Sequence, residues 1–371
     1  MKIDHKYYRS IWFKDKEEGI VQIIDQRPLP HKLVIEDLRS MKDCGQAIRE
    51  MHVRGAPLIG VTAAFGMYFA VREALQSESF QKYIGRAFIF LAETRPTAVD
   101  LFYVLRRMQQ VIDSHEDLAQ IEEACLQEAL SIADESAEQC RQIGLHGLPL
   151  IETVSKIKGG DTVNILTHCN AGWLATVDYG TALAPIYAAF DKGIKVHVWV
   201  DETRPRNQGA RLTAFELLHH GVPHTVIPDN TGGHLMQHGM VDMVIVGSDR
   251  TTRTGDVCNK IGTYLKALAA KDNEIPFYVA LPVSSFDFAL SDGLREIPIE
   301  QRSGREVKYI YGVNEQGAQE VLLTPSDSPV ANYAFDVTPA RLVSALITDR
   351  GICQSNEKSI ARLFDPQLVI K

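Results

Sequence analysis

The sequence lacks any uninterrupted run of the roughly 18 apolar residues that a membrane-spanning helix needs. Its first residues, MKIDHKYYRS, are polar and lack the apolar core of a secretory signal peptide. Both observations argue against a membrane or secreted protein. We therefore expect a cytoplasmic location.

Closely spaced cysteines are also missing. Six cysteines are spread along the chain without a CxxC motif, at positions 44, 125, 140, 169, 258 and 353. Disulfide frameworks and zinc sites usually show clustered cysteines, so neither is indicated. On spacing alone, we expect five of the six to be small core side chains.

A surplus of positive charge is absent as well. The chain has 39 Lys and Arg against 47 Asp and Glu, a net charge of −8, whereas nucleic-acid-binding domains are usually basic. With 371 residues, 45% of them hydrophobic, the chain is long enough for two domains with a sizeable core. The composition indicates a globular protein that binds no nucleic acid.

The first third of the chain is mainly helical in pattern. We expect one or two short strands before residue 30, among them GIVQIID at 19–25, and then a turn at Pro28-Leu29-Pro30. From residue 35 to about 114 the pattern is helical, and a long, acidic amphipathic helix follows. We predict a helical domain at 1–115, a linking helix at 116–145 and a second domain at 146–371.

Beyond the linking helix, strand patterns alternate with helical patterns. Predicted strands lie at 163–167, 195–200, 224–228, 243–247 and 276–280, and predicted helices at 180–191, 208–220, 231–239 and 259–271. Such alternation is typical of βαβ units, so we expect an α/β fold with a mostly parallel sheet covered on both faces. Near the end, Thr338-Pro339 predicts a helix N-cap followed by proline.

Polar side chains directly follow four of the predicted strands. The clusters are His168-Cys169-Asn170, Asp201-Glu202-Thr203-Arg204, Asp229-Asn230-Thr231 and Gly247-Ser248-Asp249-Arg250. Each alone is explained more simply by helix capping. Parallel strands, however, present their ends to one crevice, where open α/β sheets bind small ligands. Together the clusters predict a site around Cys169.

Three segments are candidate anion sites. Residues 255–260 predict a helix start with Lys260 in its first turn, where backbone N–H groups and the ammonium would hold a phosphate. Arg54 precedes Gly55, whose bare backbone a ligand can approach, and Arg95 precedes a proline at a predicted helix start. A surface lysine and two ordinary turns are the alternative interpretation.

A metal site is weakly indicated at most. His234 and His238 have the i, i+4 spacing of helical metal ligands, but the pair lacks an HExxH glutamate and an obvious third ligand. Solvated or capping histidines are the simpler interpretation. We expect no metal.

Several long motifs make the chain recognisable. They are VRGAPLIGVTAAFG, TRPTAVDL, THCNAGWLATVDYGTALAP, DETRPRNQGARLTAFEL, GSDRTTRTGDVCNKIGTY, PFYVALP, EIPIEQR and FDVTPARL. Together they resemble the methylthioribose-1-phosphate isomerase family, which shares its fold with ribose-1,5-bisphosphate isomerases and with regulatory subunits of the exchange factor for eukaryotic initiation factor 2. The similarity extends from about Ile24 to Gly351.

This resemblance implies a helical N-terminal domain, a Rossmann-like C-terminal domain and a homodimer. The implied reaction converts 5-methylthioribose 1-phosphate to 5-methylthioribulose 1-phosphate, a step of methionine salvage, without a metal or an organic cofactor. The family's catalytic residues fall on Cys169 and Asp249. Its substrate-binding residues fall on Arg54, Gly55, Ala56, Arg95, Gln208, Asn259 and Lys260.

The chain departs from the family pattern at a few positions. These are Asp100, Ala171, Trp173, Ser248, Thr254 and Gln301, none of them a catalytic position. We consider Trp173 the candidate apolar wall for the sugar's 5-substituent, and 5-deoxyribose 1-phosphate remains a possible substrate. The alternatives are a ribose-1,5-bisphosphate isomerase, for which we identify no second cationic cluster, and a non-catalytic regulatory subunit.

Overall fold

The N-terminal part starts with strands and continues with helices. The computed structural model describes residues 1–15, 18–95, 99–115 and 117–364. β1 (Lys2–Ile3) pairs with β2 (Lys6–Tyr7), and β3 (Ile11–Asp15), β4 (Ile20–Asp25) and β5 (Val34–Leu38) form an antiparallel sheet. α1 (Met41–Arg49), α2 (Ala56–Ala74), α3 (Phe80–Ala92) and α4 (Val99–Asp113) share one apolar core.

The predictions for this part are confirmed in outline. The strand at 19–25 is present, but four strands rather than one or two precede residue 30. The helical prediction from residue 35 is wrong at its start, because residues 34–38 pair with β4 as the third strand of the sheet.

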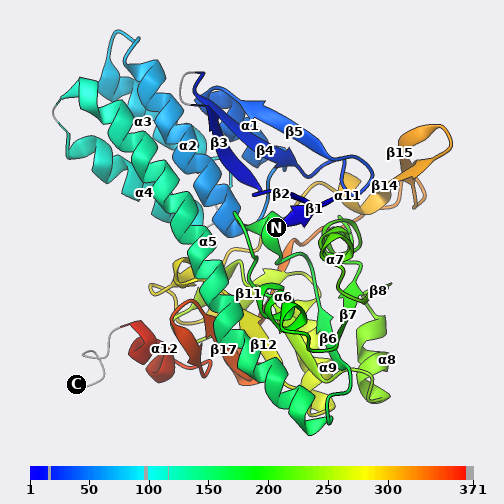
Figure 1. Cartoon of the computed structure of the whole chain (residues 1–371). Coiled ribbons are helices and arrows are strands. Elements are labelled where there is room, and N and C mark those ends of the chain that lie inside the picture. Colours follow the sequence, from blue (N-terminus) through cyan, green and yellow to red (C-terminus); the bar gives the residue numbers. More distant parts are fainter. Residues whose placement is uncertain (16–17, 96–98, 116, 365–371) are drawn as a thin grey trace.

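A single long helix connects the two parts. α5 (Leu118–Ile157) packs Ala129 and Ala133 into the core of the N-terminal helices and Ile143 and Ile151 into a core beneath the main sheet. In Figure 1 it extends from the helices at the top to the lower end of the molecule. The linking helix predicted at 116–145 is thus present but ends at 157, and residue 116 lies outside the described residues. The division at 115 and 145 stays a prediction.

The main sheet has seven strands in the order β18-β17-β12-β9-β6-β7-β8. All neighbours are parallel except β17 and β18. The strands are β6 (Val163–Thr167), β7 (Val196–Asp201), β8 (His224–Ile227), β9 (Met243–Val246), β12 (Phe277–Ala280), β17 (Ala345–Thr348) and β18 (Gly351–Cys353). The five predicted strands are confirmed to within one residue, and β17 and β18 were not predicted. This is the expected Rossmann-like α/β arrangement, with the direction of strand succession reversing between β6 and β9.

Helices cover both faces of this sheet. Ile165 of β6 packs on one face with Ile186 of α6 (Ala184–Asp191), and its neighbour Leu166 packs on the other with Leu235 of α8 (Thr231–Gln237). The remaining helices are α7 (Ala214–His220), α9 (Thr263–Asp272), α10 (Gly293–Glu296), α11 (Arg305–Lys308) and α12 (Glu357–Phe364). Alternate burial on two faces is what a doubly covered strand requires.

Two helix predictions are wrong. Asn259 and Lys260 belong to β11 (Val257–Lys260), and the helix predicted at 259–271 begins only at Thr263. Thr338 ends strand β16 (Phe335–Thr338), and the residues after Pro339 form only a 3₁₀ turn at Ala340–Leu342. In both places hydrogen bonding to a neighbouring strand outweighs the local helix signal, because β11 and β16 pair along their length.

These strands belong to a second sheet that was not predicted. Its order is β13-β10-β11-β16, with β10 (Arg250–Thr252) and β13 (Phe286–Asp287), and a separate hairpin is formed by β14 (Tyr309–Asn314) and β15 (Gly317–Leu322). The helix predicted at 208–220 opens with a π-helical turn at Gly209–Thr213, and 3₁₀ turns lie at Trp173–Ala175 and Val283–Ser285.

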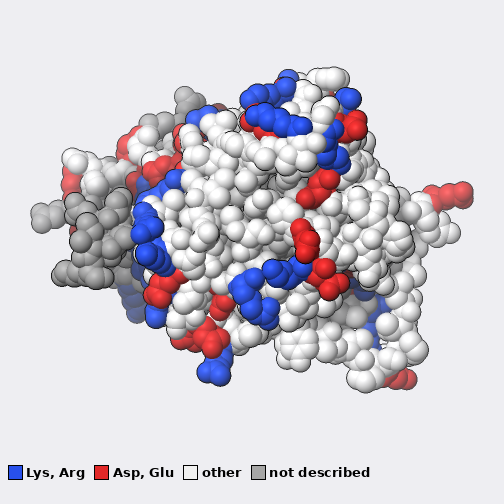
Figure 2. All heavy atoms as spheres, turned by 90° about the horizontal axis from the view of Figure 1, so that it is seen from below, with Lys and Arg blue, Asp and Glu red and all other residues white. Residues whose placement is uncertain are grey.

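In the described part of the chain, no helix has both the length and the apolarity to cross a membrane. Figure 2 shows one face of the molecule, on which Lys and Arg side chains are interspersed with Asp and Glu around a broad uncharged area.

Candidate active site

A pocket opens where the strand order of the main sheet reverses. Cys169 follows β6 and Asp249 follows β9, the two strands that flank this reversal. The predicted convergence is thus confirmed for the clusters after these two strands, whereas the clusters after β7 and β8 do not line the pocket. The cavity volume of this pocket is about 90 Å³. It is lined by every predicted site residue, namely Arg54, Gly55, Ala56, Arg95, Cys169, Gln208, Asp249, Asn259 and Lys260.

The start of helix α2 forms one wall. Gly55 has φ +93°, and a Cβ on it would lie 2.2 Å from the carbonyl oxygen of Ala175, so only glycine fits there. Pro57 lies at the first helical positions, and within the described ranges no side chain caps the helix. The backbone N–H groups at this end are thus free to face an anion.

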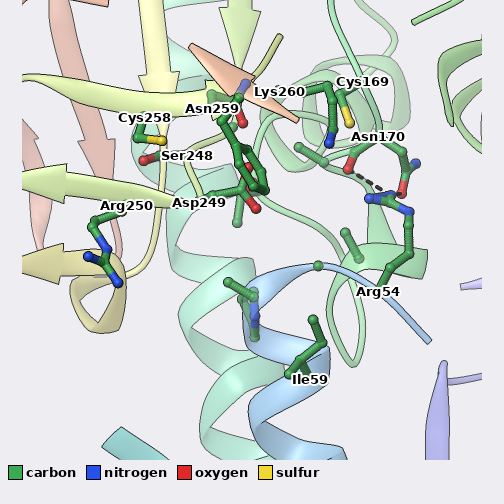
Figure 3. Close-up of a pocket in the computed structure, with 18 of the residues that line it drawn as sticks. Arg54, Ile59, Cys169, Asn170, Ser248, Asp249, Arg250, Cys258, Asn259 and Lys260 are labelled. Atoms are coloured by element: carbon green, nitrogen blue, oxygen red, sulfur yellow. Dashed lines mark hydrogen bonds between the residues drawn. The ribbon is translucent and has the colours of Figure 1, made fainter. Parts of the chain in front are cut away.

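Arg54 lies beside this helix start and contacts the segment after Cys169. Its Nη2 donates to the carbonyl oxygen of Asn170, 2.8 Å away, and to Asn170 Oδ1. Figure 3 shows Arg54 and Asn170 together on one side of the pocket, with Asp249 on the other. Among the described residues, Arg54 Nε, Arg95 Nε and Gln208 Oε1 are buried without a hydrogen-bond partner. Unpaired buried polar atoms are rare, and these suit a ligand.

Arg95 reaches the pocket from the N-terminal part. Its side chain is 13% exposed, and its Nη2 lies 3.5 Å from a carboxylate oxygen of Glu300. Burial lowers the pKa of Arg95, while the charge of Glu300 opposes that shift. The helix start predicted after Arg95 falls on residues 96–98, outside the described residues.

Cys169 has an unusual backbone conformation. Its φ is +68°, in the left-handed region that residues other than glycine seldom adopt. The Thr203 hydroxyl accepts from the Cys169 N–H at 2.8 Å, and the Thr213 hydroxyl donates to the Cys169 carbonyl oxygen at 2.7 Å. Burial raises the pKa of the thiol, whereas the charges of Arg54 and Lys260 lower it. Burial is the larger effect, so the pKa stays above that of an ordinary cysteine, and the two cations limit this rise without reversing it.

Asp249 is the acidic group of the pocket. Burial raises the pKa of its carboxyl, and Lys260, Arg95 and Arg54 oppose that shift. The negative charge of Glu300 adds to the rise. A carboxyl in such surroundings keeps its proton to higher pH than an exposed aspartate.

Lys260 lies in a strand, which corrects the predicted phosphate site at a helix start. Its ammonium is 4.5 Å from the ring centre of Phe335, and its charge acts on both Cys169 and Asp249. The helix N-terminus nearby is already occupied, since the Asp336 carboxylate accepts from the N–H groups of Gly262 at 2.7 Å and Tyr264 at 3.1 Å. The helix start that lines the pocket is that of α2.

Glu216 of α7 supports the site and was not predicted. Its carboxylate accepts from the N–H groups of Trp173 and Leu174, from Asn170 Nδ2 and from the Tyr187 hydroxyl, at 2.8–3.0 Å. Burial raises the pKa of Glu216 to about 6, against the lowering effect of these donors. A single helical glutamate gives no sequence signal for this role.

The prediction for Trp173 is wrong, whereas those for the other cysteines and for the histidine pair are largely confirmed. Trp173 is 1% exposed and packs in the core beneath the main sheet, so it is not a wall of the pocket. Four of the five cysteines expected in the core are buried, although Cys258 also lines the pocket, and Cys353 is only partly buried. His238 Nδ1 donates to the carbonyl oxygen of His234 at 2.8 Å, which is the capping interpretation.

Among the residues described, two groups of two carboxylates and a histidine lie close enough together to hold a metal ion. They are Asp25-Glu36-His52 and His168-Asp201-Asp229. In each a side chain already supplies the cation: Arg27 lies 2.8 Å from Asp25, and the Lys266 ammonium lies 3.2 Å from Asp201. Both are accounted for as ion-pair networks.

Comparison with known proteins gives consistent matches. The model of the initiation factor 2 subunit family matches residues 52–355. The chain is 55% identical to a methylthioribose-1-phosphate isomerase of Desulfatibacillum aliphaticivorans, over 99% of this chain and 100% of that protein. It is 58% identical to the protein of the same name from Desulfosudis oleivorans, over 96% of each chain.

Solved structures of related proteins are also similar to this chain over nearly its whole length. The crystal structure of 5-methylthioribose 1-phosphate isomerase from Pyrococcus horikoshii is 38% identical, with a TM-score of 0.82, and the match covers 97% of this chain and 96% of that one. The structure described as translation initiation factor eIF-2B, subunit delta, from A. fulgidus is 37% identical, with a TM-score of 0.78, over 96% of this chain and 99% of that one.

Proposed function

The chain belongs to the initiation factor 2 subunit family and, within it, to the methylthioribose-1-phosphate isomerases, and on this premise we propose that it converts 5-methylthioribose 1-phosphate to 5-methylthioribulose 1-phosphate. The observation that carries the proposal is the pocket at the sheet reversal, which brings Cys169, Asp249 and the cationic residues together. A non-catalytic regulatory subunit would not need a thiol and a carboxyl at these strand ends.

The first chemical requirement is opening of the sugar ring. The anomeric oxygen is esterified, so the ring cannot open to a free aldehyde, and the ring oxygen must be protonated as its bond to C1 breaks. Asp249 supplies this proton, because burial raises the pKa of its carboxyl. The positive charge that develops at C1 is delocalised onto the ester oxygen.

Hydrogen then moves from C2 to C1. In one route the Cys169 thiolate takes the C2 proton, an enol forms, and the same proton returns to C1. In the other, hydride moves from C2 to C1 directly. In both, the C2 hydroxyl passes its proton to the Asp249 carboxylate as the ketone forms, so the enzyme returns to its starting state. Neither route calls for a metal or an organic cofactor.

The phosphate dianion is held by the cations around it. Arg54 and Lys260 supply positive charge, and Arg95 lies in the same pocket. Gly55 and Ala56 form the start of α2, whose backbone N–H groups have no side-chain cap among the described residues. Gln208 and Asn259 complete the set of substrate-binding residues. Since Arg54 and Arg95 come from the N-terminal part, the substrate is gripped from both sides and draws the two parts together.

The direct test is turnover by the purified protein of three sugar phosphates. These are 5-methylthioribose 1-phosphate, 5-deoxyribose 1-phosphate and ribose 1,5-bisphosphate, each followed by ketose formation. We expect the first to be the best substrate. Turnover of none of them would favour the regulatory-subunit alternative, and the bisphosphate as best substrate would favour the second isomerase.

Location and assembly are part of the same proposal. A phosphorylated sugar is charged and is retained within the cell, which supports a cytoplasmic enzyme. We also propose a homodimer, as the family resemblance implies. Light scattering of the purified protein tests this, and a monomer would refute it.

A further inference from the structure

The residue before Cys169 connects the two sides of the site. His168 is 1% exposed, and both of its ring nitrogens are engaged. Nδ1 lies 2.8 Å from Asp201 Oδ2, and Nε2 lies 2.8 Å from the carbonyl oxygen of Ile261. A carbonyl oxygen only accepts, so Nε2 carries the hydrogen and donates. Ile261 directly follows Lys260.

The His168 ring is held in place on its Nδ1 side by Asp201. Asp201 is fully buried at the end of β7, and the Lys266 ammonium, 3.2 Å away, balances its charge. Lys266 in turn donates to the carbonyl oxygen of Asp229. The ring also packs on Gly262, where an added Cβ would lie 3.0 Å from Cε1 of His168. The imidazole has no freedom to turn away.

From this geometry we propose that His168 is a positioning residue that fixes Lys260 relative to Cys169. Its ring spans from the residue before Cys169 to the residue after Lys260, joining the end of β6 to the end of β11. Asp201 and Lys266 orient the ring, and the Nε2–H contact to Ile261 sets the separation of thiol and ammonium. The consequence for turnover rests on the proposed isomerase function, whereas the consequence for the thiol does not.

Two substitutions of His168 each keep only one of its two ring contacts. In His168→Gln the side-chain amide can reach the place of Nε2 and keep the contact to Ile261, whereas in His168→Asn it reaches only the place of Nδ1 and keeps the contact to Asp201. A displacement of about 1 Å at a reacting centre costs on the order of a hundredfold in rate. We expect His168→Asn to lose roughly this much turnover and His168→Gln to stay within about tenfold of wild type. His197→Gln is the matched control, because His197 lies on β7, does not line the pocket, and contacts the Thr225 hydroxyl and the Trp199 ring instead.

The second readout needs no substrate. Lys260 lowers the pKa of the Cys169 thiol, so its displacement raises the pH at which Cys169 reacts with iodoacetamide. The modified peptide is followed by mass spectrometry, because Cys258 lines the same pocket. We expect the midpoint of the reaction to rise in His168→Asn and to stay in place in His168→Gln and His197→Gln.

The outcomes are distinct. An unchanged alkylation midpoint in His168→Asn, or equal shifts in both His168 variants, overturns the proposal. If His168→Asn does not fold, a loss of turnover beyond a hundredfold in folded His168→Gln overturns it as well. A shifted midpoint in a protein that turns over none of the three sugar phosphates would leave the positioning role intact and refute the isomerase function alone.

Discussion

The guanidinium of Arg54 donates to the backbone carbonyl oxygen of Asn170, 2.8 Å away, and so ties the start of α2 to the residue that follows Cys169. The contact fixes one cation beside the thiol before any substrate binds. It also leaves Arg54 Nε buried without a partner among the described residues, which suits an incoming anion. Several consequences of this arrangement can be measured.

Cys169→Ser and Asp249→Asn should fold normally and lose turnover by roughly 10²–10⁴-fold each, the usual contribution of a positioned acid or base. Both residues face the pocket from strand ends, so the thermal midpoint should change little. Cys353→Ser, on β18, is the matched control and should retain activity. Near-wild-type turnover in either site variant would remove that residue from the mechanism.

Local glycine, arginine and cysteine motifs point to most of the site residues, whereas Gln208 is identified only through the family resemblance. Cys169, Asp249 and the seven residues predicted to bind substrate all line one pocket, and the prediction places five strands of the main sheet to within a residue. The catalytic and substrate-binding roles of these residues stay predictions.

What the sequence did not reveal depends on contacts between distant segments. Lys260 follows the turn at Gly255-Asp256, which resembles a helix start, yet β16, some 75 residues later, pairs with it as a strand. Trp173 looked available for a ligand because it follows Cys169, but Glu216 on α7 holds its backbone N–H and the ring packs into the core. A local sequence pattern does not identify the distant segment that pairs or packs with it.

Lys260→Ala and Arg54→Ala should weaken substrate binding through the phosphate. Each removes a charge-assisted contact of about 1.5–3 kcal/mol, or roughly ten- to a hundredfold in affinity. Inorganic phosphate should compete with substrate in the wild type and compete less in both variants, while Lys271→Ala, exposed on α9, should behave as wild type. Undiminished competition would place the anion site elsewhere.

Glu216→Ala should destabilise the protein by about 2–4 kcal/mol, because the change leaves several buried donors without an acceptor. Denaturant unfolding measures the effect, with exposed Glu78→Ala as the control.

Glu216 also predicts that the free energy of unfolding depends on pH. Burial raises the pKa of folded Glu216 to about 6 from 4.5, so its proton stabilises the folded state fully below about pH 4.5, and this is lost as pH rises through about 6. The stability difference between wild type and Glu216→Ala should therefore be about 1 kcal/mol larger at pH 5 than at pH 7. A difference that grows with pH would contradict this assignment.

Glu300→Gln should shift the pH profile of turnover. The Glu300 charge contributes to the raised pKa of Asp249, and the reaction requires Asp249 protonated. Removing that charge lowers the pKa, so activity should fall at a lower pH than in the wild type. Glu320→Gln, which affects only an exposed ion pair with Arg305, should leave the profile in place. If activity instead appears at a lower pH than in the wild type, deprotonated Asp249 is the active form, and a shift of the profile to higher pH would contradict the effect assigned to Glu300.

The preference for the 5-substituent follows from the composition of the pocket. With Trp173 excluded, its apolar lining comes from residues such as Met51, Ile59, Ile297 and Phe335. A methylthio group buries more apolar surface than a methyl group, so 5-methylthioribose 1-phosphate should be favoured over 5-deoxyribose 1-phosphate. One such group is worth only about 1–3 kcal/mol, so kcat/KM should differ by roughly ten- to two-hundredfold without exclusion of the smaller substrate.

Ribose 1,5-bisphosphate should be rejected more strongly, because a second dianion would be buried without cations of its own. Arg54, Arg95 and Lys260 are needed by the first phosphate and the reacting groups, and Arg250 lies 3.7 Å from the Asp287 carboxylate. Comparing kcat/KM for the three substrates measures the order directly. If the bisphosphate turns over as well as the methylthio sugar, the 5-position faces cations, and the assignment of one phosphate to all three cationic residues is wrong.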